Sequence, residues 1–142
     1  MQVRDLMSRD VVFISPEEPV SVAARLLSRN NVGALPVCSR DGRLRGMLTD
    51  RDIVLRCVAA QQDPLSTTVR SIMTSRVVSA DPEEDAGEAI RRMGAEQVRR
   101  LPVTEGGRVV GMLSLGDAAL HRGSAAEAVE SLRAISRNVQ KK

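Results

Sequence analysis

The chain has 142 residues, of which 42% are hydrophobic and 27% are charged, and its formal net charge is +3. This length suits one compact domain, or two small halves that share a core, and the composition is that of an ordinary globular protein. Acidic and basic residues are interspersed, so no basic stripe for nucleic acid stands out. Aromatic residues make up only 1% of the chain, which removes the stacking platforms that single-stranded nucleic acid uses.

Neither a membrane span nor a secretion signal is visible in the sequence. No apolar run approaches the roughly eighteen residues that cross a bilayer, and the N-terminus lacks the apolar core of a signal peptide. We therefore expect a cytoplasmic protein with no membrane partner. Cys38 and Cys57 are too few for a disulfide framework or a metal site. We expect two buried, inert thiols, with a Cys38–Cys57 redox pair as the alternative.

One unit is written twice along the chain. Val3-Arg4-Asp5-Leu6-Met7-Ser8 is matched by Val69-Arg70-Ser71-Ile72-Met73-Thr74, and Leu35-Pro36-Val37 is matched by Leu101-Pro102-Val103. These matches share an offset of 66 residues. We expect a first repeat over 1–62, a linker over 63–68, a second repeat over 69–122 and a C-terminal helical tail over 123–142.

Each repeat is predicted to have the order β-α-β-β-α. The predicted strands are Val11–Ile14, Ala34–Cys38 and Leu44–Leu48 in the first repeat and Val77–Ala80, Leu101–Thr104 and Val109–Leu113 in the second. The first helix of each repeat is predicted to begin at Pro-Glu-Glu, with acids in its first turn. Its apolar stripe is Val20, Ala23, Ala24 and Leu27 in one repeat and Ala86, Ala89, Ile90 and Met93 in the other. The closing helices begin at Thr49 and Ser114.

A repeat of roughly fifty residues is too small to bury a sufficient core by itself, whereas two copies packed together are not. We therefore predict an α/β (α+β) fold in which two repeats pack with pseudo-two-fold symmetry and leave two related clefts. The tail from Ser124 to Asn138 is predicted to be a helix. Its apolar stripe of Ala128, Leu132, Ile135 and Val139 would pack on the module or on a second copy.

Both repeats end on the pattern Gly, two apolar residues, a hydroxyl residue, two free positions and Asp. The hydroxyl residues are Thr49 and Ser114, and the acids are Asp52 and Asp117. One interpretation is a capping box, in which hydroxyl and carboxylate satisfy the first amides of a helix. The other is a ligand site, in which those amides attract a phosphate and the carboxylate accepts the hydroxyls of a ribose. The second copy in a matched context favours the ligand site.

Together, the paired β-α-β-β-α units, the L-P-V strands and the G-x-x-[ST]-x-x-D endings resemble a tandem CBS (cystathionine beta-synthase) domain pair, or Bateman module. The resemblance covers Val3 to about His121 and is similar to stand-alone bacterial CBS-pair proteins and to the regulatory insert of inosine monophosphate dehydrogenase. It implies that the clefts bind AMP, ADP, ATP, S-adenosylmethionine or a related nucleotide. It also implies a disc-like homodimer.

The resemblance carries two composite sites onto this sequence. In site A, the base is surrounded by Ser15, Val20, Gly33 and Ala34, while Arg99, Arg100, Ser114 and Asp117 take the phosphate and the ribose. In site B, Asp81 and Ala86 lie near the base together with Arg99 and Arg100, and Thr49 and Asp52 bind the sugar. Because two guanidinium groups suit a phosphate, and site B offers none to it, we expect a phosphorylated adenosine to prefer site A.

Alternatives remain for several of these residues. Arg99 and Arg100 would otherwise form a solvated strand edge or pair with Glu83 and Glu84. Catalysis is not supported, because the chain has a single histidine (His121, expected to be exposed at a helix end), no metal-ligand spacing and no nucleophile with a matching base.

We therefore expect a non-enzymatic sensor that needs no cofactor or metal and that relays ligand occupancy to a separate effector protein. The alternatives are a constitutive interaction module with vestigial clefts and, less favoured, a nucleic-acid-binding protein.

Overall fold

The computed structural model describes residues 1–140, and side chains up to residue 137. The chain divides into two compact units, which we describe separately. Unit 1 contains Met1–Val11, Val78–Gly106 and the chain from Val110 onward, and unit 2 contains Val12–Val77 with Gly107–Val109. No helix within residues 1–140 is both long and apolar enough to cross a membrane.

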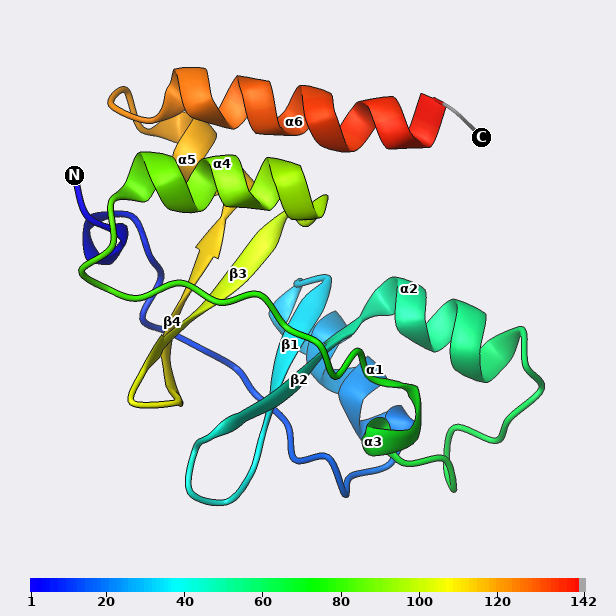
Figure 1. Cartoon of the computed structure of the whole chain (residues 1–142). Helices are drawn as coiled ribbons and strands as arrows, with labels where there is room; N and C mark the ends of the chain where they lie inside the picture. The colour runs from blue at the N-terminus through cyan, green and yellow to red at the C-terminus, as the bar shows by residue number, and fades with distance from the viewer. Residues whose placement is uncertain (141–142) are drawn as a thin grey trace. The chain divides into compact units, whose positions relative to one another are not determined.

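Unit 2 consists of a two-stranded antiparallel sheet and short helices (Figure 1). Its elements are α1 (Val20–Asn30), β1 (Ala34–Cys38), β2 (Leu44–Thr49), α2 (Asp50–Ile53), the π-helical turn η2 (Val54–Val58) and α3 (Val69–Ile72). In the hairpin, Leu35 pairs with Leu48 and Ala34 with Thr49. The core contains Ile14, Val20, Ala23, Leu27, Leu35, Val37, Leu48, Cys57, Val69 and Ile72.

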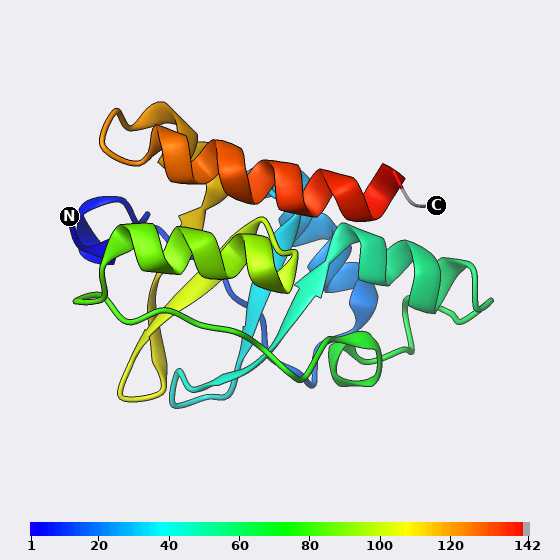
Figure 2. The same ribbon diagram turned by 45° about the horizontal axis from the view of Figure 1, so that its top comes forward.

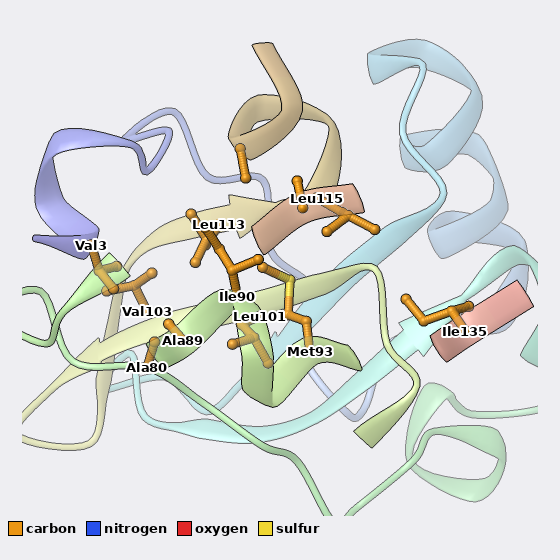
Figure 3. Packing of buried hydrophobic residues seen from close by; sticks show 12 residues of the cluster. Val3, Ala80, Ala89, Ile90, Met93, Leu101, Val103, Leu113, Leu115 and Ile135 are labelled. Carbon is orange, nitrogen blue, oxygen red and sulfur yellow. The ribbon is translucent and has the colours of Figure 1, made fainter. Parts of the chain in front are cut away.

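Unit 1 repeats this plan and adds a long helix. Its elements are the 3-10 helix η1 (Val3–Asp5), α4 (Ala86–Glu96), β3 (Arg100–Glu105), β4 (Arg108–Ser114), α5 (Leu115–Leu120) and α6 (Ala125–Gln140). Figure 3 shows its core, in which side chains from η1, α4, both strands and α5 converge. The core residues are Val3, Ala80, Ala89, Ile90, Met93, Leu101, Val103, Leu113, Leu115, Ala118, Ala128 and Ile135.

The start of each repeat packs into the unit built mainly from the other repeat. The Val3 N–H donates to the Glu84 carbonyl (2.9 Å) in unit 1, and the Val69 N–H donates to the Glu18 carbonyl (2.9 Å) in unit 2. Val3 and Val69 are both fully buried in these positions. The sequence showed this motif as a repeat but assigned it no structure, because the partner segment lies far away in the chain.

Glycine in the G-M-L strands is required by that incoming segment. A methyl group on Gly46 would lie 2.7 Å from the Thr74 carbonyl oxygen, and one on Gly111 would lie 2.9 Å from the Ser8 carbonyl oxygen. Both contacts are closer than a carbon atom tolerates. The glycines therefore allow two backbones to pair, as seen in the mutual hydrogen bonds of Met47 with Thr74 (2.9 Å).

The predicted first strands are shorter in the structure. Val11–Ile14 and Val77–Ala80 each reduce to a single parallel bridge, Ile14 to Val37 and Ala80 to Val103. A proline follows two residues later in each repeat, where the chain turns instead of extending the ladder. The hairpin strands agree with the prediction to within one residue at each end.

The predicted Pro-Glu-Glu helix starts are wrong. α1 begins at Val20 and α4 at Ala86, so the glutamates before them lie in turns. The cause is the incoming segment, whose N–H groups occupy the carbonyl oxygens of Pro16, Glu18, Pro82 and Glu84. A helical turn would need those carbonyls for its own hydrogen bonds.

The C-terminal helix packs on its own unit, which is one of the two arrangements predicted for it, the other being packing on a second copy. α6 lies beside α4 and contacts α5 (Figures 1 and 2). Ala128 and Ile135 of the predicted stripe are buried, but Leu132 is 43% exposed and Ser131 is buried in its place. The helix is rotated in this way because the Ser131 hydroxyl donates to the Ile90 carbonyl (2.6 Å). Val139 lies outside the residues whose side chains are described.

Candidate functional site

Unit 1 contains a pocket of about 420 Å³, large enough for a small ligand. Arg99 and Arg100 line it from the start of β3, and Ser114 lines it from the end of β4. The structure brings these residues together because the Leu115 N–H donates to the Arg99 carbonyl (2.9 Å), which ties the end of β4 to the start of β3. The pocket therefore places two guanidinium groups and a hydroxyl at one opening.

The rest of the lining is apolar or small. Leu115, Gly116 and Ala119 contribute from α5, and Ala128, Val129 and Leu132 contribute from α6. Sequence reasoning missed these residues. An amphipathic tail was visible in the sequence, but no local signal says which part of the chain a helix will cover.

Asp117, the fourth residue assigned to this side of site A, is exposed and is not among the pocket-lining residues. Its backbone N–H donates to Ser114 Oγ (3.0 Å), so the hydroxyl caps α5. In the described part of the chain, the Asp117 carboxylate forms no ion pair and no hydrogen bond.

Asp52, the corresponding acid in unit 2, already takes part in hydrogen bonds. The Asp52 N–H donates to Thr49 Oγ1 and the Thr49 N–H donates to Asp52 Oδ2, both at 3.0 Å. This is the complete capping box that the sequence offered as one interpretation. A ligand at Thr49 and Asp52 would therefore have to compete with a formed helix cap. The Asp117 carboxylate does not cap its helix, so a ligand there would meet no such competition.

Unit 2 also holds the small residues of site A. The Asp50 N–H donates to the Gly33 carbonyl (2.9 Å), and Ala34 pairs with Thr49, so this corner repeats the arrangement of Arg99 and Ser114 without its charges. The difference between the two corners follows from Gly33 and Ala34 standing where the second repeat has Arg99 and Arg100.

Four other predicted site residues lie on the turns and first helical positions of the two units. Val20 and Ala86 are the first residues of α1 and α4, and both side chains are fully buried in their unit cores. Ser15 accepts a hydrogen bond from the Glu17 N–H (3.3 Å), and Asp81 accepts one from the Glu83 N–H (2.9 Å). Ser15 and Asp81 therefore have turn-forming roles irrespective of any ligand.

The alternative pairing of Arg99 and Arg100 with Glu83 and Glu84 is wrong. Glu83 pairs with Arg4 (3.1 Å), and Glu84 accepts hydrogen bonds from Arg92. The hydrogen bond from Arg92 holds the pKa of the Glu84 carboxyl below its ordinary value and raises the pKa of Arg92. Arg99 and Arg100 are exposed side chains at the pocket mouth.

The two cysteines are buried and form no disulfide with each other, which agrees with the prediction of two buried thiols. Burial raises the pKa of the Cys38 thiol to about 11, which removes the thiolate character that reactive cysteines need. His121 is exposed at the end of α5, as predicted. Within the described residues, no group of three or more His, Cys, Asp or Glu side chains is placed to hold a metal ion.

Comparisons with known proteins agree with the repeat. The family model "CBS domain" matches residues 3–58 and 69–122. The CBS domain-containing protein YhcV of Bacillus subtilis is 40% identical over 94% of this chain and 94% of its own length. Hypoxic response protein 1 of Mycobacterium tuberculosis is 37% identical over 83% of this chain and 82% of that protein.

Solved structures show the same fold. A crystal structure of Hypoxic Response Protein I with two coordinated zinc ions has a TM-score of 0.79 and 36% identity, and it covers 85% of this chain and 98% of that one. The CBS domain pair of protein MJ0100, in complex with 5'-methylthioadenosine and S-adenosyl-L-methionine, has a TM-score of 0.76 and 26% identity over 84% of this chain and 93% of that chain.

Proposed function

Since this chain belongs to the CBS domain family, we propose that it is a non-enzymatic regulatory module that binds an adenosyl ligand and relays its occupancy to a partner protein. The observation that carries the proposal is the pocket of unit 1, where Arg99, Arg100 and Ser114 converge. The MJ0100 pair, which binds S-adenosyl-L-methionine and 5'-methylthioadenosine, shows that this fold takes adenosyl compounds in a relative.

The charge of the pocket selects among adenosyl ligands. Two guanidinium groups at one opening favour a ligand that carries phosphate, because each can donate two hydrogen bonds to phosphate oxygens. AMP, ADP and ATP are therefore better candidates here than S-adenosylmethionine, whose sulfonium is positively charged. In unit 1, the proposed site A uses this pocket and Asp117, and it is preferred over site B, whose Asp52 already caps α2.

The free energy of ligand binding is sufficient to drive the proposed relay of ligand occupancy to a partner. A ligand shifts the balance between two arrangements of a protein only by binding one of them more tightly than the other. We propose that the ligand-bound arrangement is the one that an effector protein recognises, in the cytoplasm, where the free thiols of Cys38 and Cys57 would stay reduced.

We predict that Arg100→Ala weakens the binding of AMP by about 10- to 100-fold, because it removes charge-assisted hydrogen bonds to the phosphate. Isothermal titration calorimetry on the full chain measures this loss of affinity. In a thermal-shift assay, AMP at about 100 times its Kd should stabilise the wild-type protein by roughly 2.7 kcal/mol.

Arg91→Ala is the matched control, because Arg91 is equally exposed but lies on α4 and does not line the pocket. AMP affinity that fell equally in both variants would point to general electrostatic attraction. If the wild-type protein bound none of AMP, ADP, ATP, S-adenosylmethionine and 5'-methylthioadenosine, the constitutive interaction module would replace this proposal.

We also propose a homodimer as the functional assembly. Val54, Leu55 and Val58 form an apolar face on η2, and 49% of Leu55 and 63% of Val58 are exposed. Leu120, which stands in the second repeat where Leu55 stands in the first, is exposed as well. Ala119 and Gly123 stand where Val54 and Val58 stand in the first repeat, so the full face belongs to the first repeat. Such an exposed apolar face suits the self-complementary contact of a two-fold dimer.

A further inference from the structure

α6 contributes an apolar wall to the pocket of unit 1. Ala128, Val129 and Leu132 line the pocket from this helix, while Arg100 lines it from the first position of β3 and Arg99 from the position before that strand. α6 lies beyond residues 69–122, the second segment matched by the family model. The wall is therefore an addition that this chain makes to the repeat.

The wall is fixed in position by a close contact between helices. A methyl group on Gly94 of α4 would lie 2.8 Å from Ser131 Cα, so the two helices approach as closely as a glycine allows. The Ser131 hydroxyl is buried and bonded to the Ile90 carbonyl. Val129 and Leu132 lie beside this buried face and are 47% and 43% exposed, so their atoms remain available to a ligand.

We propose that Val129 and Leu132 determine specificity by restricting this pocket to adenosyl ligands with a single phosphate group. The inference rests on the proposed function. One phosphate carries a charge of roughly −2, which Arg99 and Arg100 together neutralise. Among the described lining residues these are the only cations. Further phosphates would lose water against aliphatic side chains that offer no hydrogen bond in return, and this costs free energy.

The test replaces the wall residues by lysine, which adds a cation where the further phosphates of ATP would lie. Leu132→Lys and Val129→Lys should each raise the affinity for ATP relative to AMP by about tenfold, the effect of one added charge-assisted hydrogen bond. Both side chains are already half-exposed, so the substitutions should leave the fold intact. Calorimetric Kd values for AMP, ADP and ATP on the full chain give the ratio.

Leu65→Lys is the matched control, because Leu65 is 72% exposed in unit 2 and does not line the pocket. We expect the wild-type protein and this control to prefer AMP to ATP by the same factor. A wild-type preference for ATP would overturn the inference. So would an unchanged ratio in both wall variants, while a loss of AMP binding in Arg100→Ala would still uphold the proposed function. If the wild-type protein bound no nucleotide, the proposed function itself would fail.

Discussion

At the level of single residues, Arg92 links α4 to the segments that precede it. Its guanidinium donates to Glu84 Oε1 (2.9 Å) and to the Ser79 carbonyl (2.7 Å), and only 20% of the Glu84 side chain is exposed. Unit 2 has Leu26 at the position that corresponds to Arg92, so the ion pair belongs to unit 1 alone. It holds the turn before α4 in place through a charge-assisted contact.

This pair predicts a pH dependence of stability. Because folding lowers the pKa of Glu84, the carboxylate stabilises the native state above the ordinary pKa of glutamate, and that contribution is lost as the pH falls through the lowered value. Glu84→Gln should therefore reduce the free energy of unfolding by about 1 kcal/mol at pH 7. Urea unfolding at pH 7 and pH 3 measures the change, which should shrink at the lower pH.

Glu83→Gln is the control for this prediction. Glu83 pairs with Arg4, but 74% of its side chain is exposed, and such pairs contribute little. We expect a change within about 0.5 kcal/mol at either pH. Equal losses in the two variants would mean that general surface charge is responsible and that the Arg92 contact has no special role.

At the level of elements, β2 and β4 each have a glycine where the incoming segment crosses. We predict that Gly111→Ala lowers the free energy of unfolding by about 1–3 kcal/mol, because the added methyl group meets the Ser8 carbonyl at 2.9 Å and Met7 Sδ at 2.7 Å. Thermal unfolding without ligand should show a Tm lower by about 2–4 °C for each kcal/mol.

Gly116→Ala is the control for Gly111→Ala, because we expect it not to lower the free energy of unfolding. Gly116 lies in the first turn of α5, and the nearest atom to an added methyl group is Ser114 Oγ at 3.9 Å. Because alanine is the better helix former, this variant should be neutral or more stable by up to about 1 kcal/mol. Destabilisation of both variants by the same amount would contradict the proposed role of the crossing segment.

At the level of the whole molecule, the proposed homodimer can be tested by measuring the oligomeric state in solution. We predict that Val58→Asp converts a dimer to a monomer, because it places a charge on the apolar face that Val58 forms with Val54 and Leu55. Analytical ultracentrifugation measures the mass in solution. Leu65 is an apolar residue that is 72% exposed and lies outside this helix, so Leu65→Asp should leave the assembly unchanged. A wild-type monomer at all concentrations would exclude the dimer.

The hairpins and the closing helices could be predicted from the sequence because their signals are local. Strand alternation, the turn between Ser39 and Gly42, and the hydroxyl caps at Thr49 and Ser114 are each readable within a few residues. The same locality explains why Arg99, Arg100 and Ser114 could be chosen together: the repeat places them at the ends of adjacent strands, and the structure finds them around one pocket.

The helix starts and the burial of the helix faces depended on distant segments. Ala24 and Ile90 occupy corresponding positions of the two predicted apolar stripes, yet Ala24 is exposed and Ile90 is fully buried, because α6 covers α4. No local pattern contains that information.

The sequence by itself therefore determined the repeat, the hairpins, the family and the charged side of the pocket, since all of these follow from neighbouring residues or from self-similarity. The tertiary structure alone decided that the start of each repeat packs into the unit built mainly from the other repeat, and that α6 lines the pocket with Val129 and Leu132. These features depend on contacts between segments far apart in the chain, where a side chain's partner is set by packing.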